Sequence, residues 1–336
     1  MPQVTIPSDS ASQKTMVAVL ATAADAGNPL AMLKVDHVPL PKVPAGWVRV
    51  KIQAAAINYH DIFTLQGVAV HPLNYPMILG CEGCGSLEDG TPVILYPVMG
   101  DPDYLGDETL DPRRHVFHEI TGGTLAEYVV APARNVLPRP PELDATRGAV
   151  LGISWLTAYR MIFTKSGIRA GQTMLVQGSS GGVSTALIQL GAAAGMRVWC
   201  TGRSEEKRDL AKKLGAERSF APGESLPSLV DAVFDTSGEA TWAHTLEAVK
   251  PGGTIVTCGA HGGFQVSMSL RRIFNDQISI HGVYAGTMQE FKDLIQFVIA
   301  KNIQPMIGKV VPISDAYKAF EAVYGGRTSG KAVVTM

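Results

Sequence analysis

The sequence predicts an α/β protein in which a β-rich region adjoins a doubly wound parallel sheet. In the second half of the chain, short apolar strands alternate with helical segments, which is the pattern of a parallel sheet covered by helices on both faces. In the first 135 residues, short β-like runs are instead separated by Gly and Pro. The 336 residues are enough for about two domains.

The first half of the chain is expected to consist of strands and loops. Residues 47–52 (WVRVKI) alternate between apolar and polar side chains, as a half-buried strand does, and residues 92–97 (PVILYP) form another apolar run. Residues 14–24 imitate a signal peptide, with a cation, a short apolar run and small residues, but a polar tail precedes them and we favour a first strand. Residues 101–114 lack periodicity, which predicts a long excursion of the kind that is often functional.

The second half is expected to alternate between strands and helices. Continuous apolar runs predict strands at residues 173–177, 197–201, 232–235 and 254–258, the last entered through a turn at 251–253, and residues 330–336 are also strand-like.

Three helices follow from local signals. One of small residues is expected over 183–194. Another begins after Ser204, a favourable N-cap, and stops before Gly215, with acids in its first turn and lysines in its last. The third is amphipathic, because four apolar residues recur at helical spacing: Phe291, Leu294, Ile295 and Val298.

Composition excludes several classes of partner. Lys and Arg number 29 and Asp and Glu number 30, so the formal net charge of −1 offers no electrostatic footprint for nucleic acid or an anionic membrane. No apolar stretch reaches 18 residues, which predicts no membrane span. Four scattered cysteines are too few for a disulfide framework, which favours a reducing compartment and a cytoplasmic location.

A glycine-rich turn gives the strongest functional signal. It comprises Gly178, Ser179, Ser180, Gly181, Gly182 and Val183, and it stands between a predicted strand and a predicted helix. Glycines there let the backbone approach a pyrophosphate, whose charge the helix N-terminus stabilises. The turn therefore predicts dinucleotide binding, with a tight structural turn as the alternative.

The end of the next strand indicates which dinucleotide is expected. An NAD site usually has Asp or Glu there to bind the ribose hydroxyls, whereas this chain has Gly202, Arg203 and Ser204, with Lys207 one turn later. A guanidinium suits a 2′-phosphate, so we expect NADPH rather than NADH. The alternative is a solvated Arg at the start of a helix.

Several motifs occur in an order that is more specific than any one of them. They are residues 54–61 (AAAINYHD), 80–85 (GCEGCG), 156–159 (LTAY), the glycine-rich turn, 250–256 (KPGGTIV) and 330–334 (GKAVV). Together they resemble the medium-chain dehydrogenase/reductase superfamily, and most of all its zinc-independent quinone and enoyl reductase branch. The resemblance extends over nearly the whole chain from about residue 16.

The resemblance implies an arrangement of domains and an assembly. A GroES-like catalytic domain is expected over residues 1–140 and 286–336, with a Rossmann NADPH-binding domain inserted over residues 141–285 and the active site in the cleft between them. Residues 277–283 resemble the last Rossmann strand of the family, which commonly pairs across a two-fold axis. A homodimer is therefore expected.

The resemblance also argues against zinc. Zinc-dependent members have a Cys, a His and a third ligand, often Cys, where this chain has Asn58, Cys81 and Ile153. Residues 101–114 stand where the structural-zinc lobe would be and contain no Cys. Because a catalytic zinc needs about three protein ligands, no bound metal is expected.

Cys81 has two other interpretations. With His60 and either Asp61 or Glu82 it would form an improvised metal site, and with Cys84 it forms a C-x-x-C motif. Neither cysteine precedes a redox-type helix and no second C-x-x-C exists, so we interpret both as structural.

The catalytic residues implied by the resemblance lie in one loop. Asn58 matches an asparagine that is common beside the nicotinamide in zinc-free reductases, where it would orient substrate or ribose. Tyr59 and His60 follow it and would donate to a developing enolate, and His60 occupies the position of a proton-relay hydroxyl in zinc-dependent relatives. The alternative for each is packing or a structural hydrogen bond.

Other residues are expected around the cofactor and substrate. Thr157 matches a nicotinamide contact, and Gly259 and Val283 lie at strand ends where backbone groups would meet the carboxamide. Tyr96, Trp155 and Tyr284 are expected to line the substrate pocket, with packing in the core as the alternative.

These observations predict an NADPH-dependent, zinc-independent reductase of a small molecule. Ketone or alcohol redox calls for a Lewis acid or strong donor at oxygen, whereas hydride addition to an enone, enoyl compound or quinone places charge on a delocalised enolate that ordinary hydrogen bonds stabilise. One alternative is a biosynthetic member of the same scaffold with a non-redox, cyclising or binding role. A zinc-dependent alcohol dehydrogenase is the other.

Overall fold

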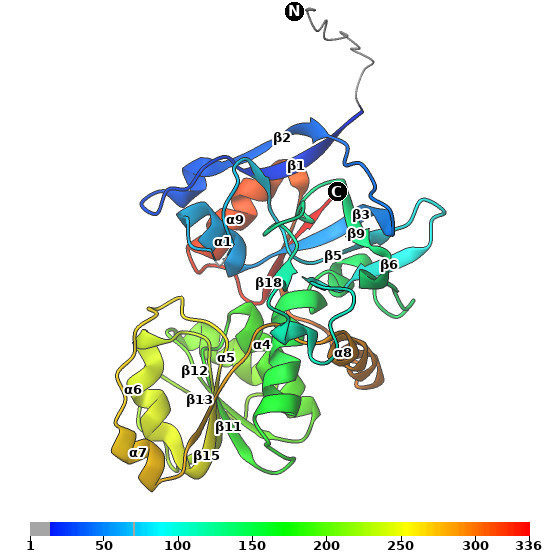
Figure 1. Cartoon of the computed structure of the whole chain (residues 1–336). Helices are drawn as coiled ribbons and strands as arrows, with labels where there is room; N and C mark the ends of the chain where they lie inside the picture. The colour runs from blue at the N-terminus through cyan, green and yellow to red at the C-terminus, as the bar shows by residue number, and fades with distance from the viewer. Residues whose placement is uncertain (1–13, 70) are drawn as a thin grey trace, which may run out of the picture.

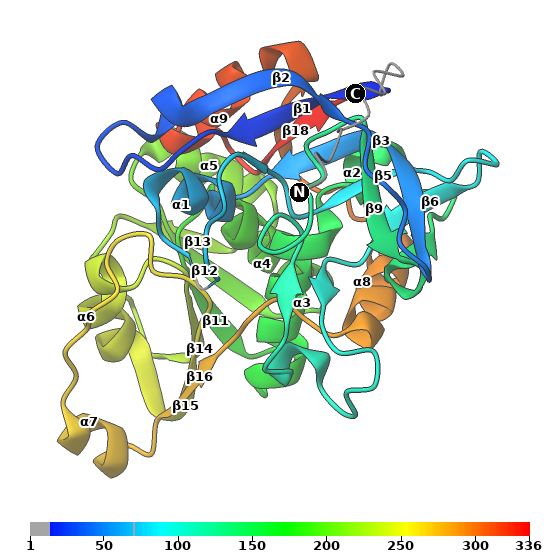
Figure 2. The same cartoon turned by 45° about the horizontal axis from the view of Figure 1, so that its top comes forward.

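The computed structural model describes residues 14–69 and 71–336. It has two lobes (Figure 1), one holding the blue and red segments and the other the green and yellow ones. The strands β1 and β2 lie with α9 on the side of the first lobe that faces away from the second, as Figure 2 also shows. The α/β fold class predicted from the sequence is confirmed.

The first lobe is built from antiparallel sheets and one parallel pair. Its main sheet has the order β10-β6-β5-β3-β18-β17, with β9 also paired to β3, and smaller sheets have the orders β2-β1-β4 and β7-β8. In chain order the strands are β1 (Thr15–Ala21), β2 (Leu33–Pro39), β3 (Trp47–Ile57), β4 (Met77–Ile78), β5 (Gly83–Ser86), β6 (Pro92–Leu95), β7 (Val98–Met99), β8 (His115–Val116), β9 (Tyr128–Pro132), β10 (Val136–Pro138), β17 (Ile307–Pro312) and β18 (Lys331–Thr335).

The centre of that sheet joins distant parts of the chain. β3 pairs antiparallel with β18, so that Ile57 lies opposite Ala332 and Ala54 opposite Thr335. The alternation predicted for residues 47–52 is seen over residues 50–53 of β3, whereas residues 47–49 are all half-buried. Residues 54–57 are buried without alternation because this part of the strand is covered on both faces. Small side chains there let neighbouring elements approach closely.

The second lobe contains a parallel sheet with the order β13-β12-β11-β14-β15-β16. Its strands are β11 (Thr173–Gln177), β12 (Arg197–Thr201), β13 (Arg218–Phe220), β14 (Val230–Asp235), β15 (Val249–Thr257) and β16 (Ser279–Gly282). The strand order reverses between β11 and β14, and in open α/β sheets a ligand binds at such a point.

The local predictions for this lobe are confirmed, with one difference at β15. The predicted strands at 173–177 and 197–201 coincide with β11 and β12. The predicted strand at 254–258 begins earlier, because the expected turn at 251–253 is a bulge within β15 at which Gly252 has a φ of +72°. A left-handed conformation of this kind favours glycine.

The helices follow the expected signals. They are α1 (Tyr59–Gln66), α2 (Ala145–Gly148), α3 (Leu156–Tyr159), α4 (Gly182–Ala193), α5 (Glu205–Lys213), α6 (Glu239–Ala248), α7 (Leu270–Asn275), α8 (Met288–Ala300) and α9 (Ala316–Tyr324). The Ser204 hydroxyl caps α5 by accepting from the Lys207 N–H at 3.3 Å. All four apolar residues predicted for the amphipathic helix are buried on α8.

The excursion at 101–114 is held by charged contacts. The buried guanidinium of Arg160 contacts Asp107 and lies 2.7 Å from Glu290 Oε2. The Met288 N–H donates to Glu108 Oε1 at 2.6 Å, so the excursion is fixed to the start of α8. Across residues 14–69 and 71–336, no helix combines the length and apolar character needed to cross a bilayer.

Candidate active site

The glycine-rich turn lies between the end of β11 and the first turn of α4, where the sheet order reverses. Gly181 is the N-cap of α4 and has no side chain to occupy the N–H groups of the first turn. A Cβ on Gly182 would lie 2.8 Å from Lys331 Cδ and 2.9 Å from Ser154 Oγ, so no larger residue fits. The turn thus offers free N–H donors and the positive end of a helix dipole, which suits a phosphate.

The turn is tied to the first lobe. The Gly330 N–H donates to the Ser180 carbonyl at 2.7 Å, directly before β18 begins. Lys331 then places its side chain against Gly182. The glycine-rich turn and the centre of the β3–β18 pair therefore meet at one point.

A second group of cations follows β12. Arg203 is exposed, and among the described residues no carboxylate lies within ion-pair distance of it. Lys207 donates to the Gly326 carbonyl at 2.8 Å, and burial together with the nearby Arg203 charge lowers the Lys207 pKa. A Cβ on Gly202 would lie 2.5 Å from Ser179 Oγ and 2.8 Å from Arg208 Cγ, so a larger residue would displace those side chains. Two positive side chains thus stand beyond the glycine-rich turn, with Glu205 and Glu206 between them in the first turn of α5.

Asn58 lies at the end of β3 with its amide committed to protein partners. Its Nδ2 donates to Glu82 Oε1 at 2.9 Å, while its Oδ1 accepts from Lys331 Nζ at 2.6 Å and from Ser154 Oγ at 3.2 Å. The residue is buried. Asn58 therefore links three segments, and its amide has little capacity left for a substrate.

Lys331 and Glu82 form a buried ion pair at the same place. Their Nζ and Oε1 atoms are 2.9 Å apart, and their side chains are only 3% and 0% exposed. Lys331 also donates to the Ile57 carbonyl at 2.8 Å, and Glu82 Oε2 accepts from the Ile153 N–H at 2.7 Å. Sequence reasoning missed Lys331, although a charge in the apolar run KAVVT was a signal.

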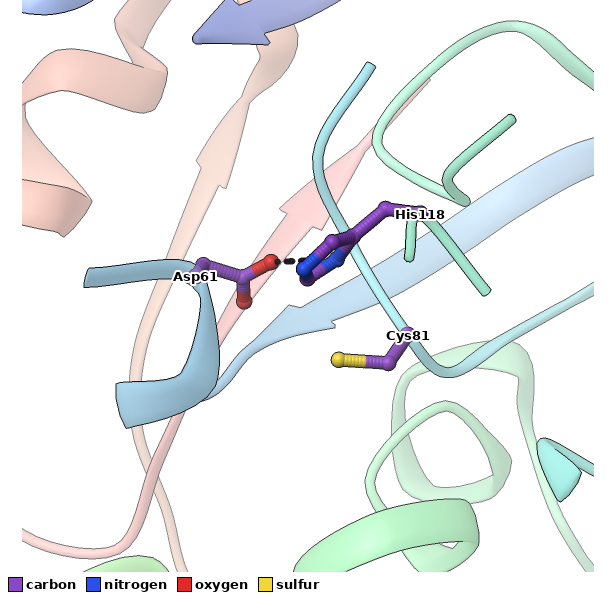
Figure 3. Close-up of side chains that lie close together, drawn as sticks. All are labelled: Asp61, Cys81 and His118. Atoms are coloured by element: carbon purple, nitrogen blue, oxygen red, sulfur yellow. Dashed lines mark ion pairs between the residues drawn. The ribbon is translucent and has the colours of Figure 1, made fainter. Parts of the chain in front are cut away.

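Asp61 fixes the loop that carries Tyr59 and His60. Its Oδ2 accepts from the Asn58 N–H and its Oδ1 accepts from the Gly80 N–H, both at 2.8 Å. This closes a capping box at the start of α1. Figure 3 shows Asp61 pointing toward the His118 ring, whose Nδ1 lies 3.2 Å from Oδ1.

His60 lies on the first turn of α1 against a second acid. Its Nε2 is 3.1 Å from Glu119 Oε1, and its ring stacks on His118 with centroids 4.8 Å apart. Attraction to Glu119 and Asp61 outweighs burial and raises the His60 pKa. Glu119 was not singled out from the sequence, because no local pattern marks it.

Comparison with known proteins identifies the family to which this chain belongs. Residues 44–141 match the family model "Alcohol dehydrogenase GroES-like domain", and residues 182–300 match "Zinc-binding dehydrogenase". A zinc-type alcohol dehydrogenase-like protein of Schizosaccharomyces pombe is 30% identical over 331 residues, covering 90% of this chain and 94% of that protein. The chain belongs to the medium-chain dehydrogenase/reductase superfamily. As a member, it is an oxidoreductase.

Two further members of the superfamily are informative. An acryloyl-coenzyme A reductase of Sulfurisphaera tokodaii is 29% identical over 322 residues, covering 90% of this chain and 96% of that protein. The solved structure of an NAD-dependent alcohol dehydrogenase has a TM-score of 0.88 at 30% identity, with coverage of 96% of this chain and 100% of that one. The fold is therefore shared along almost the full length of the chain.

Some members of the superfamily bind zinc, and the residues here do not fit a catalytic zinc. At the ligand positions expected from the resemblance, Asn58 contacts the Lys331 ammonium, and Ile153 offers an aliphatic side chain. A different trio, Asp61, Cys81 and His118, has its ligand atoms within 4.8 Å of one another (Figure 3).

This trio lacks the features of a catalytic centre. Both Asp61 oxygens already accept backbone N–H groups. Burial and the charges of Asp61 and Glu82 hold the Cys81 pKa well above its usual range, which disfavours the thiolate that a metal requires. All three residues are buried, whereas a catalytic zinc keeps an open position for substrate.

The remaining predicted residues differ in how exposed they are and in what they contact. Tyr59 is 37% exposed and its ring lies 5.8 Å from that of His261, on the second lobe. Trp155 is fully buried and lines no open surface. Tyr96 is buried and donates to the Gly286 carbonyl at 2.9 Å. Tyr284 is half-buried, with the Arg114 guanidinium 5.0 Å above its ring.

Of the three predicted cofactor contacts, one lies on a helix and two follow strand ends. Thr157 is buried on α3. Gly259 follows β15, and the Val283 N–H donates to the Thr257 carbonyl at 2.9 Å just after β16. Their proximity to a nicotinamide stays a prediction.

Proposed function

We propose that this protein is an NADPH-dependent reductase that acts without a catalytic metal on a C=C bond conjugated to a carbonyl, in an enone or enoyl compound, or on a quinone. The observation that carries the proposal is the Lys331 ammonium, which contacts Asn58 at a position where zinc-dependent relatives have a metal ligand. The Lys331 ammonium already places a positive charge at this position, and the Glu82 carboxylate balances that charge. Chemistry that needs a Lewis acid on a ketone oxygen is therefore disfavoured here.

The residues present fit the dinucleotide. The glycine-rich turn and the N-terminus of α4 would hold the pyrophosphate, and Arg203 and Lys207 would hold the 2′-phosphate beyond Gly202. Thr157, with the strand ends at Gly259 and Val283, would border the nicotinamide. In this proposal residues 141–285 form the cofactor-binding domain, and the cleft toward residues 1–140 and 286–336 holds the substrate.

When bound, the reduced nicotinamide supplies a hydride to the β-carbon of the substrate and leaves oxidised. The charge that develops on the substrate spreads over the α-carbon and the carbonyl oxygen, and N–H and O–H donors are sufficient to stabilise it. Because the Asn58 amide is committed to Glu82 and Lys331, its role is to fix the loop. Tyr59 and His60 are the donors that remain on that loop, with Tyr96 and Tyr284 shaping the substrate side, while Trp155 is fully buried in the core.

We also propose a homodimer formed through the outer edge of β16. Among the described residues, no strand pairs with that edge. The preceding α7 exposes Leu270 and Phe274, which are 72% and 70% accessible. An unpaired strand beside large exposed apolar side chains is a surface that a second copy can cover.

The proposed preference for NADPH over NADH is tested by fluorescence titration with both cofactors. Arg203→Ala removes a charged contact worth about 1.5–3 kcal/mol, so NADPH binding should weaken about 10- to 150-fold while NADH binding changes little. Arg169→Ala, an exposed arginine that precedes β11 at the opposite end of the strand, is the matched control and should leave both unchanged. Equal losses for NADPH and NADH in Arg203→Ala would remove the 2′-phosphate contact from the proposal.

The reaction itself is tested by following NADPH oxidation with small enones, enoyl thioesters and quinones after exhaustive treatment with a chelator. Turnover of at least one class by the metal-free protein is expected. Activity that returns only when zinc is added would contradict a metal-free reductase and favour the alcohol dehydrogenase alternative.

A further inference from the structure

A histidine and a glutamate from different segments meet beside the loop that carries Asn58. His60 stands on the first turn of α1, and Glu119 lies just after β8. Their Nε2 and Oε1 atoms are 3.1 Å apart, while the His60 side chain is 29% exposed and that of Glu119 is 6% exposed. The carboxylate is thus buried behind an imidazole that remains accessible.

Glu119 is held in a fixed orientation. Its Oε2 accepts from the Val116 N–H at 2.7 Å, which leaves Oε1 directed at His60. Attraction to His60 and this backbone hydrogen bond outweigh burial and lower the Glu119 pKa, so the carboxylate is charged at neutral pH. A second imidazole, that of His71, lies 3.9 Å from Oε2.

The His60 ring is constrained on two sides as well. It stacks on His118, which is itself held by Asp61 and lies 3.0 Å from Thr64 Oγ1. The His60 Nε2 is buried and is not aligned for a hydrogen bond to Glu119, so the 3.1 Å contact acts through charge. Neither ring nitrogen of His60 makes a hydrogen bond among the described residues, and Nδ1 is the one that also lacks an ion-pair contact.

Resting on the proposed function, we propose that His60 and Glu119 form the proton-donor unit of the reaction, in which Glu119 is a positioning residue that keeps His60 charged and directs its Nδ1 toward the substrate. A carboxylate beside one ring nitrogen favours a proton there and leaves the other nitrogen for transfer. Glu119 is not marked by any local sequence pattern.

With an enone, hydride adds two electrons and one hydrogen to the β-carbon, and the cofactor is oxidised. The Nδ1–H bond of His60 breaks while a C–H bond forms at the α-carbon, or an O–H bond forms at the oxygen before tautomerisation. His60 is left neutral, and a proton from water restores it. For a quinone, the same proton ends on a hydroquinone oxygen.

The proposal predicts how pH affects activity. His60 donates only when protonated, so activity falls as pH rises through its pKa, and Glu119 moves that fall to higher pH. The titratable groups that contact or act on His60 are Asp61, His118 and Glu119, and His71 lies against the other oxygen of Glu119. Of these, Glu119 is the carboxylate in direct contact with the ring, and an opposite charge so close shifts a pKa by about one unit or more.

The experiment compares the full-length wild type with Glu119→Gln and Glu119→Asp. NMR titration of the isotope-labelled histidines, with His60 assigned by its loss in His60→Gln, gives the His60 midpoint without cofactor or substrate. Glu119→Gln keeps the size and the acceptor for Val116, and it should lower the midpoint by about one pH unit. Glu119→Asp, which keeps the charge, should restore most of it. Thermal melting checks that each variant is folded.

Activity then separates the possible outcomes. With NADPH and an enone, the alkaline limb of kcat should move down in pH together with the NMR midpoint, while the KM for NADPH stays constant. An unchanged midpoint in folded Glu119→Gln overturns the pair. A moved midpoint with an unmoved alkaline limb overturns the donor role. Absence of turnover by the wild type refutes the reductase proposal and the donor role with it, and the NMR midpoint still reports whether the pair exists.

Discussion

Replacing Lys331 with Met tests the buried ion pair at the centre of the site. Methionine preserves the length of the side chain but leaves the Glu82 carboxylate buried without its counter-charge. Removing one partner of a buried pair costs about 3–5 kcal/mol. Glu82 keeps two donors, the Asn58 amide and the Ile153 N–H, so we expect the lower end, about 3 kcal/mol.

This cost translates into a measurable change in Tm. At about 2.1 cal/mol/K per residue, a chain of 336 residues has an unfolding entropy of about 0.7 kcal/mol/K, so Lys331→Met should lower Tm by about 4 °C. Circular dichroism melts provide the assay. The double variant Lys331→Met with Glu82→Gln should melt above Lys331→Met alone, because no uncompensated charge remains.

An exposed ion pair supplies the control. Lys318 and Asp315 are 2.9 Å apart, with side chains 64% and 40% exposed, and Lys318→Met should cost less than about 1 kcal/mol. The reasoning would be refuted if Lys331→Met melted within 1 °C of the wild type, or if the double variant melted below the single one.

Three other outcomes are expected. The double variant Leu270→Arg with Phe274→Arg should convert a dimer to a monomer, because it places a charge on each exposed apolar position. Light scattering measures the mass, and an unchanged mass would place the interface elsewhere. Asp61→Ala should lower the unfolding free energy by about 2 kcal/mol or more in urea titration, because the α1 cap and the contact to Gly80 are both lost, and a loss under 0.5 kcal/mol would contradict this. Burial raises the pKa of Cys200 and of Cys258 to about 12, so the native protein at pH 8 should react slowly with a thiol reagent. All four thiols should react only after unfolding. Rapid reaction of Cys200 before unfolding would contradict its burial.

The parts of the fold that the sequence predicted are those with local causes. The apolar runs of β11 and β12 and the periodicity of α8 depend on neighbours along the chain. The bounds of both strands agree with the prediction, and the four apolar residues named for the helix are buried on α8. At β15, the residues Pro251, Gly252 and Gly253 have turn chemistry, but strand pairing with β14 continues past them through a bulge. Tertiary pairing overrides local preference there.

The site was less predictable, because its contacts join distant residues. The resemblance suggested Asn58 as an amide that orients substrate or ribose, but its environment depends on Lys331, 273 residues away, and on Ser154, 96 residues away. The contact between His60 and Glu119 likewise depends on how the segment after β8 packs against α1. The roles of the cofactor and substrate residues stay predictions until the titrations described above are made.

The pairing of β3 with β18 has a consequence for biosynthesis. The Ile57 carbonyl and the Lys331 ammonium are 274 positions apart, whereas the parallel sheet uses a contiguous stretch from Thr173 to Gly282. On the ribosome, the parallel sheet can therefore form while β3 still has an unpaired edge. The neighbourhood of Asn58 is completed only when β18 arrives, so a nascent chain can form the lobe with the parallel sheet before the contacts around Asn58 exist. Chaperone dependence should accordingly concentrate on that exposed edge of β3 during translation.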